Sequence, residues 1–231
     1  MLILFNGIKE SNLVPTFMKI ADISAIYKGK GSKNDSNSER GIFVVSVYRA
    51  IFMKLIYNNN YEILEKHMST SQIGGRKNMH IGNHIWILNS VVHDVLTTKG
   101  ASPINLQILD IRQCFDGLWS EECDSDIFQY GVQDNTINLL YDASQNIQLV
   151  IGTLVGITKK NVANTVMQGD VLGPPLCSTS IDTIEKECIE EQKHLYKYKE
   201  NVEIPPLAMM DDLMCIPTSG IESVKINSLL V

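Results

Sequence analysis

Two adjacent carboxylates, Asp211 and Asp212, stand in the otherwise apolar segment PPLAMMDDLMCIP, which runs from Pro205 to Pro217. Burying charge without a partner is costly. The segment has two apolar arms around an acidic tip, a pattern that predicts a β-hairpin. Either this tip is open to water, or its carboxylates bind a divalent cation.

A third carboxylate of interest, Asp110, follows the short apolar run NLQIL in the segment NLQILDI, from Asn105 to Ile111. Apolar residues on both faces of a short strand are typical of a central, covered position in a sheet. If this strand pairs with the hairpin, Asp110 and Asp211 become neighbours. Carboxylate oxygens of this kind are the ligands that Mg²⁺ prefers.

The apolar content of 44% indicates a globular protein with ample core material. The length of 231 residues allows one large domain or two small ones. No apolar run is long enough to span a membrane, and the opening MLILFNGIKE is too short for a secretory signal. We therefore expect an intracellular protein without a membrane partner, in either cytoplasm or nucleus. The five cysteines are scattered without a CxxC pair, so we expect buried apolar thiols and neither disulfides nor a zinc site.

The net charge of −6 by itself argues against a nucleic-acid-binding surface. However, the segment 1–54 contains eight Lys and Arg residues and only four Asp and Glu residues. This amino-terminal part could therefore bind phosphate groups. The histidines form no cluster with the carboxylates. His80 and His84 are four residues apart, and we interpret them as a helix-surface pair.

Sequence periodicity predicts alternating strands and helices. Alternation up to Tyr27 indicates a strand, followed by a loop rich in Gly, Ser, Asn and Lys and an apolar segment from Ile42. Helical spacing follows in two places, at Tyr48, Phe52, Leu55 and Ile56, and at Ile81, Ile85, Leu88, Val92 and Val95.

In the second half of the chain, the sequence pattern predicts a hairpin, then a helix, and then the hairpin with the acidic tip at Asp211 and Asp212. The segment 149–169 reads as a hairpin that turns near Lys159, Lys160 and Asn161. Pro174 and Pro175 suit the first turn of a helix. In that helix Cys177, Ile181, Ile184 and Cys188 form a core face, and Glu185, Glu190 and Glu191 are expected to face water. The whole pattern favours an α+β layer, with helices on one face of a largely antiparallel sheet.

Three segments in this order, QILDIRQCFD, MQGDVLGPPL and MMDD, resemble the palm of a reverse transcriptase of the non-LTR (LINE-like) retrotransposon type. Upstream, ISAIYKGKGSKNDSNSERGIFVVS resembles that family's fingers, and SQIGGRKNMHIGNHIW resembles its QFGFR segment. The resemblance implies fingers and a fingers-palm region at 1–100 and a palm at 101–231, with the antiparallel palm sheet covered by helices.

The resemblance also implies roles for the carboxylates. It makes Asp110 and Asp211 the ligands that bridge two Mg²⁺ ions, or Mn²⁺, with Asp212 less directly involved and the Ile111 carbonyl as a further ligand. The pair of ions would promote transfer of a nucleotide from a dNTP to a primer 3′-hydroxyl. Asp116, which matches the end of a family motif, is interpreted as a helix cap.

The remaining site residues implied by the resemblance contact nucleotides or strands. Lys28, Lys30 and Arg40 are candidates for binding the triphosphate, with a solvated loop as the alternative for the lysines. Phe115 occupies the position that disfavours a 2′-hydroxyl, or it is simply a core aromatic. Gln168 and Gly169 match the motif beside the nascent base pair, or the glycine only ends a hairpin. Arg76 is expected to contact the template or the backbone of the fingers, and Met209 stands at the position that contacts the template or the primer end.

Several positions depart from the family pattern. Gln113 replaces a lysine, Gly173 replaces a serine, and Met209 replaces an aromatic residue. The sequence ends nineteen residues after Asp212, without the family's thumb, and it begins without an endonuclease region.

We therefore expect part of a retroelement polyprotein or a decayed copy. Its function is RNA-directed DNA polymerisation with an RNA template, a DNA primer and dNTP. The alternative is an inactive, truncated remnant that at most binds nucleic acid. An RNA polymerase is disfavoured by Phe115. We expect weak or absent extension by the chain alone and dNTP-selective extension once the carboxy-terminal part is restored.

Overall fold

The computed structural model describes residues 1–33, 35–99, 103–111, 114–153, 156–191, 196–199 and 202–217. Each of its two folding units combines two separate segments of the chain. The first unit consists of Met1–His67 and Gln113–Cys177, and the second consists of Met68–Arg112 and Ser178–Val231. The structure is thus a mixed α/β fold in which neither unit ends at residue 100. The assignment of 1–100 and 101–231 to fingers and palm remains a prediction.

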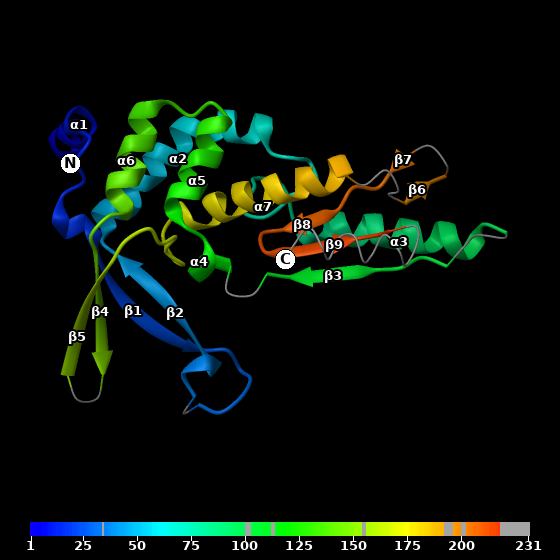
Figure 1. The fold of residues 1–231 in the computed structure, drawn as a ribbon, viewed down its shortest axis with the longest axis horizontal. Helices are drawn as coiled ribbons and strands as arrows, with labels where there is room; N and C mark the ends of the chain where they lie inside the picture. Colours follow the sequence, from blue (N-terminus) through cyan, green and yellow to red (C-terminus); the bar gives the residue numbers. More distant parts are fainter. Residues whose placement is uncertain are drawn as a thin grey trace. The chain divides into compact units, whose positions relative to one another are not determined.

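A four-stranded sheet in the order β2-β1-β4-β5 forms the framework of the first unit (Figure 1). Its strands are β1 (Ile20–Tyr27), β2 (Glu39–Val45), β4 (Ile147–Thr153) and β5 (Gly156–Val162). The central pair, β1 and β4, runs parallel, whereas the two outer pairs are antiparallel. The basic loop between β1 and β2 contains a short 3₁₀ helix, η2 (Ser36–Ser38).

The hairpin β4–β5 turns earlier than predicted. Its register pairs Thr153 with Gly156, so that Lys159 and Lys160 lie inside β5. Gly156 has a φ of +144°, a backbone conformation that L side chains rarely adopt. This glycine, rather than the polar run of lysine and asparagine, marks the turn.

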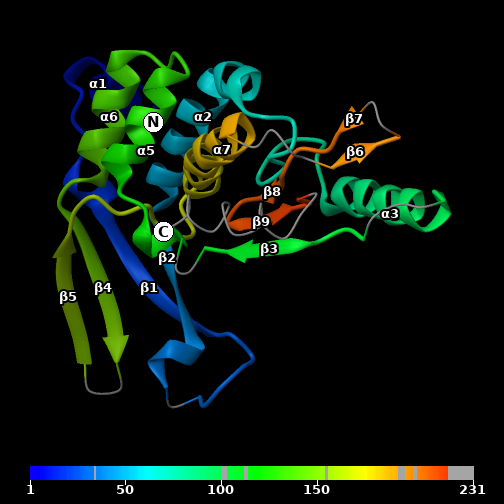
Figure 2. The same cartoon turned by 45° about the vertical axis from the view of Figure 1, so that its right-hand side comes forward.

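The helices of the first unit gather at one end of its sheet, and the β4–β5 hairpin extends away from them (Figures 1 and 2). These elements are α1 (Leu2–Ser11), η1 (Thr16–Lys19), α2 (Val47–His67), α4 (Cys114–Gly117), α5 (Ser120–Gln129) and α6 (Asp134–Ser144). Their core includes Phe5, Met18, Phe52, Ile56, Ile127 and Leu139. Of the apolar face predicted for α2, Phe52 and Ile56 are buried, but Tyr48 and Leu55 are exposed.

The second unit contains a three-stranded antiparallel sheet in the order β3-β9-β8. Its strands are β3 (Gln107–Asp110), β8 (Leu207–Met209) and β9 (Asp212–Cys215), and a separate hairpin is formed by β6 (Lys197–Tyr198) and β7 (Val202–Glu203). The helix α3 (Ile81–Thr97) runs alongside this sheet in both views (Figures 1 and 2). The hairpin predicted at the acidic segment is confirmed.

The prediction of a central position for Asn105–Ile111 is wrong for the residues that the structure describes. Strand β3 lies at the edge of its sheet, and the side chain of Ile108 is 73% exposed. Only its other face is covered, where Leu109 packs against Ala208 and Leu213. Apolar residues on both faces therefore do not identify a covered strand here.

Helix α3 buries a different face from the one predicted. Ile81 and Ile85 are exposed, whereas His84 and Val91 are buried. The interpretation of His84 as a surface residue is therefore wrong. His84 is accommodated because its Nε2 lies 2.9 Å from the Ser71 carbonyl oxygen, which satisfies a polar atom of the ring.

Helix α7 (Gly173–Glu191) begins at the two prolines, as predicted. Cys177 and Ile181 are buried on its core face. Glu185, however, is fully buried rather than turned to water, because the Ser71 hydroxyl binds its carboxylate. Cys114, Cys123, Cys177 and Cys215 are buried, as predicted for those four residues. No helix among the described residues is long and apolar enough to cross a membrane.

Candidate active site at an acidic hairpin

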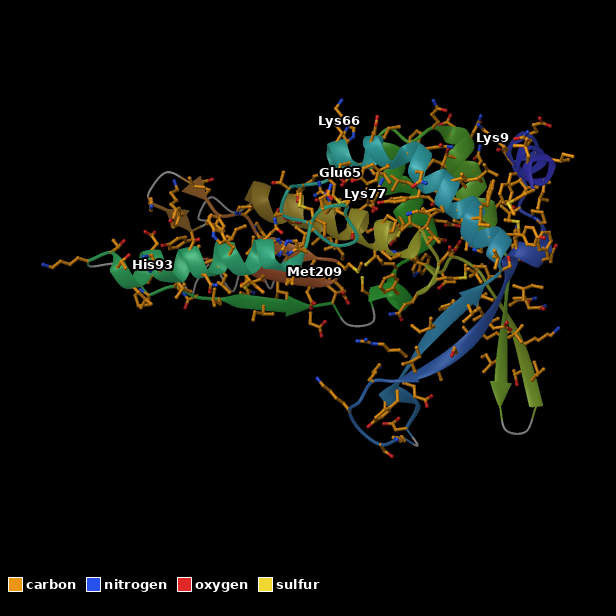
Figure 3. The ribbon with its side chains drawn as sticks, turned by 180° about the vertical axis from the view of Figure 1, so that it is seen from behind. Lys9, Glu65, Lys66, Lys77, His93 and Met209 are labelled. Atoms are coloured by element: carbon orange, nitrogen blue, oxygen red, sulfur yellow. The ribbon has the colours of Figure 1, made fainter. Side chains whose placement is uncertain are left out.

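Strand pairing in the second unit brings the predicted carboxylates together. The register of β3 and β9 pairs Asp110 with Asp212, and the Ile111 amide donates to the Asp211 carbonyl oxygen at 3.4 Å. Paired residues of antiparallel strands project from the same face, so Asp110 and Asp212 share a face and Asp211 occupies the turn beside them. Met209 pairs with Asp212 across the hairpin and is 39% exposed (Figure 3).

The charges of this acidic hairpin repel one another. Burial raises the pKa of the Asp212 carboxyl above its usual value, and the nearby charges of Asp211 and Asp110 raise this pKa further. A bound cation would offset this repulsion. The group therefore has an excess of negative charge that suits a divalent ion.

Within the part of the chain that the structure describes, no three His, Cys, Asp or Glu side chains are arranged to hold a metal by themselves. Magnesium bound with a nucleotide uses one or two carboxylates and completes its octahedron with phosphate oxygens and water. The acidic hairpin fits a site of this substrate-completed kind. Asp110, Asp211 and the Ile111 carbonyl are the groups that would hold the ion.

The loop 69–76 packs against the acidic hairpin, and Arg76 helps to hold this loop in shape. Its Nη1 donates to the carbonyl oxygen of Ser69 and, at 2.7 Å, to that of Gln72. Its guanidinium therefore contacts backbone, in line with the second of the two expected roles, although this backbone is that of its own loop. The predicted contact of Arg76 with the template remains a prediction.

A buried polar network beneath this loop escaped the sequence analysis. Its members are Ser69 and Ser71 of the loop and Asp182 and Glu185 of α7. The Ser69 amide donates to Asp182 Oδ1 at 2.8 Å, and the Ser71 hydroxyl donates to Glu185 Oε1. A usable signal was present in the sequence: Gly74 and Gly75 stand two and three residues after Gln72, and paired glycines in a loop indicate a close backbone approach.

The basic candidates lie in the first unit and are exposed there. Lys28 Nζ donates to the Asn37 carbonyl oxygen at 2.9 Å, which links the two sides of the β1–β2 loop. Arg40 lies on β2 opposite Ile26, and its side chain is exposed, as is that of Lys30. Exposed cations in this position remain available to a phosphate.

Gly169 allows two backbone segments of the first unit to approach closely. The Phe43 amide donates to the Gln168 carbonyl oxygen at 2.8 Å. A Cβ at Gly169 would lie 2.5 Å from the Phe43 carbonyl oxygen, and its φ is +116°. This supports the structural reason for a glycine in the Gln168–Gly169 motif, and the predicted nucleotide contact remains a prediction.

Phe115 lies in α4 and is half-buried in the first unit. A Cβ at Gly173 would lie 2.7 Å from the Met167 carbonyl oxygen and 3.5 Å from Phe115 Cε1. The glycine found in place of the family's serine therefore fits this packing. Gln113 and the side chain of Asp116 lie outside the described residues.

A buried ion pair holds the segment that follows Gln168 and Gly169. Arg49 of α2 donates from Nε to Asp170 Oδ2 at 2.7 Å, and its Nη1 donates to the carbonyl oxygens of Met18 and Ala143 at 3.3 and 3.0 Å. The sequence analysis missed this pair because its members are 121 residues apart.

Comparison with known families explains this arrangement of motifs. Residues 31–227 match the family model described as reverse transcriptase (RNA-dependent DNA polymerase). The chain belongs to the reverse transcriptase family. The acidic hairpin, the basic loop and the Gln168–Gly169 segment all lie in the matched part of this reverse transcriptase, apart from Lys28 and Lys30 at the start of the loop.

Solved structures share the fold of this chain. Apo telomerase from Candida tropicalis, truncated from its C-terminal domain, has a TM-score of 0.62 and 14% identity, over 97% of this chain and 50% of that one. Telomerase from Candida albicans, in complex with the TWJ fragment of telomeric RNA, has a TM-score of 0.59 and 11% identity, over 98% of this chain and 42% of that one. The chain thus spans half or less of these telomerases. A comparison with curated proteins gave no match.

Proposed function

We propose that this chain contributes the polymerising centre of an RNA-directed DNA polymerase, in which Asp110 and Asp211 bind two divalent ions. The observation that carries the proposal is the pairing of β3 with β9, which places Asp110 opposite Asp212 and beside the Asp211 turn. Family membership supports the reaction class.

The reaction joins the primer 3′-oxygen to the α-phosphorus of a dNTP and releases pyrophosphate. Divalent ions at such a site lower the pKa of the attacking hydroxyl and neutralise charge on the leaving group. Asp110 and Asp211 would hold these ions, which are Mg²⁺ or Mn²⁺, and the Ile111 carbonyl would complete the set. Asp212 adds negative charge from the same sheet face, and its pKa is raised by burial and then by the charges of Asp211 and Asp110.

The first unit would supply the contacts to the incoming nucleotide. Lys28, Lys30 and Arg40 would bind the triphosphate, and their exposure is consistent with this role. Phe115 would exclude a 2′-hydroxyl and so select dNTP over rNTP. Gln168 and Gly169 would lie beside the nascent base pair.

An RNA template and a DNA primer are the proposed macromolecular partners. The telomerases that share this fold include two solved with the TWJ fragment of telomeric RNA. Here Arg76 and Met209 would contact the strands. We assign the chain to the non-LTR retrotransposon type, with fingers and palm regions, as part of a retroelement polyprotein.

Primer extension tests the proposal. The chain is assayed alone and joined to the carboxy-terminal part of a related reverse transcriptase, with an RNA template, an annealed DNA primer, Mg²⁺ and either dNTPs or rNTPs. We expect Mg²⁺-dependent extension that prefers dNTPs in the joined protein. Asp110→Ala and Asp211→Ala should each lower the rate by about 100-fold or more, because each removes a ligand of the ions.

Asp134→Ala is the matched control, because Asp134 is an exposed carboxylate at the start of α6. It should extend the primer as well as the unmodified protein does. If the Asp110 and Asp211 variants extended primers as fast as this control, the assignment of the acidic hairpin would be wrong.

A further inference from the structure

The side chain of Gln72 is hydrogen-bonded to the turn that contains Asp211. Gln72 has an exposed fraction of 0%, although its side chain is polar. Its Oε1 accepts hydrogen bonds from the amides of Met210 and Gly74 at 3.0 and 2.9 Å, and its Nε2 donates to the Met210 carbonyl oxygen at 3.4 Å. One amide side chain thus binds both backbone polar groups of Met210.

Met210 is the residue that needs such support. It precedes Asp211 in the turn, and its φ is +55°, in the left-handed region that disfavours side chains other than glycine. A residue in this region costs about 1–2 kcal/mol unless its surroundings compensate. Because Gln72 presents both a donor and an acceptor, it stabilises this backbone conformation where a carboxylate or an apolar side chain could not.

The backbone around Gln72 is fixed to the same hairpin. The Ile73 amide donates to the Ala208 carbonyl oxygen at 2.9 Å, and the Ala208 amide donates to the Ser71 carbonyl oxygen at 3.2 Å. A Cβ at Gly74 would lie only 2.4 Å from the Met210 nitrogen. The segment therefore lies against β8 through an isolated parallel β-bridge between Gln72 and Ala208, with no room between Gly74 and the turn.

Buried acids of α7 hold the other side of this segment. Asp182 accepts from the Ser69 amide, Glu185 accepts from the Ser71 hydroxyl, and both acids have exposed fractions of 0%. Gln72 is thus fixed at its backbone as well as at its amide.

We propose that Gln72 is a positioning residue for nucleotide transfer, which sets the turn at Met210 so that Asp211 and Asp212 face Asp110. This inference rests on the proposed function. Gln72 contacts neither substrate nor ion, and acts only through the backbone of Met210. Removing its amide should leave the carboxylates present but poorly oriented.

Gln72→Met tests the inference, because methionine keeps the length of the side chain and removes the three hydrogen bonds of the side-chain amide. In the joined protein used for primer extension, kcat should fall by about tenfold or more, because small errors in orientation have large effects on rate. The KM for dNTP should stay within about twofold, since the triphosphate contacts are elsewhere. Gln129→Met, at an exposed glutamine of α5, should change neither value.

Hydrogen exchange of the Met210 amide gives a readout that does not depend on activity. Exchange should be faster in Gln72→Met than in the unmodified chain and in Gln129→Met. Gly74→Ala, whose new methyl group would push the loop away from Met210, should accelerate the same exchange and lower kcat. This second variant reaches the turn without altering Gln72.

Unchanged kcat and unchanged Met210 exchange in Gln72→Met would overturn the inference, provided that Asp110→Ala abolishes extension. If instead Asp110→Ala had no effect on extension, the proposed function would be wrong. The exchange measurement would still show whether Gln72 holds the turn. The two failures are therefore distinguishable.

Discussion

At the level of single residues, Asp212 is an exposed carboxylate whose pKa is nonetheless raised. The pKa of its carboxyl is raised first by burial and then by the charges of Asp211 and Asp110. An isolated pair of aspartates at a hairpin tip would be screened by water. The third carboxylate, Asp110 of β3, pairs with Asp212 and adds negative charge beside the turn, which supports the proposed cation site.

Glu185 is a second residue whose environment opposes its charge. Its pKa is raised to about 7, mainly by burial and also by the charge of Asp182, against the lowering effect of hydrogen bonds from Ser71 and Ser69 and the charge of Lys186. Its Oε2 has no hydrogen-bond partner among the described residues. The folded state therefore favours a protonated Glu185 at slightly acidic pH.

Glu185→Gln should flatten the pH dependence of stability. In the unmodified chain the folded pKa, about 7, lies above the usual value of 4.5. The free energy of unfolding should then fall as pH rises from 4.5 to 7, by up to about 1.4 kcal/mol per pH unit. Glutamine cannot ionise, so the variant should lose this decline. Urea unfolding between these pH values measures the difference.

Asp124→Asn is the companion variant for this measurement. Burial and the charge of Glu121 raise the pKa of Asp124 to about 7 as well. Each single variant should remove part of the decline, and the double variant should remove most of it. Burial lowers the pKa of His84, which makes the free energy of unfolding rise with pH. Because His84 is present in every variant, this contribution is the same in all of them and drops out of the comparison. Equal slopes in Glu185→Gln and the unmodified chain would show that Glu185 is ionised throughout.

At the scale of elements, the Arg49–Asp170 pair ties α2 to the segment after Gln168 and Gly169. The same guanidinium also satisfies carbonyl oxygens at the end of η1 and in α6. Both side chains are buried. An ion pair of this kind contributes mainly by preventing an uncompensated charge, so loss of either partner is costly.

Arg49→Met should lower the free energy of unfolding by about 3–5 kcal/mol, because it leaves Asp170 buried without its cation. Arg40→Met, at an exposed arginine of β2, should change stability by less than about 0.5 kcal/mol. Chemical unfolding of both variants provides the comparison. A loss below about 1 kcal/mol in Arg49→Met would mean that Asp170 finds other partners.

The helices and strands whose formation depends on the local spacing of apolar residues could be predicted from the sequence. Alternation, helical spacing and paired prolines correctly predicted β1, α2, α3, the start of α7 and the acidic hairpin. The buried faces were less predictable. The bonds of Glu185 and His84 to Ser71 and of Gln72 to Met210 join residues 13 to 138 positions apart, so the local pattern does not indicate that these polar residues are buried.

At the scale of the whole molecule, the order of the motifs along the sequence was the main basis for predicting that the carboxylates lie together. Asp110 and the pair Asp211–Asp212 are about a hundred residues apart in sequence, yet adjacent strands bring them together in one unit. The organisation into two units, each made of two segments, was not predictable, because long-range packing rather than a linker defines the boundaries. For the same reason the edge position of β3 could not be predicted from its apolar composition.

Binding of Mn²⁺ by the chain tests most directly whether the acidic hairpin is a divalent-cation site. Electron paramagnetic resonance of free Mn²⁺ measures the affinity, and added Mg²⁺ should compete. Asp110→Asn and Asp211→Asn should each weaken binding by on the order of tenfold or more, whereas Asp134→Asn should leave it within about twofold. Equal affinity in all three variants and the unmodified chain would contradict the account.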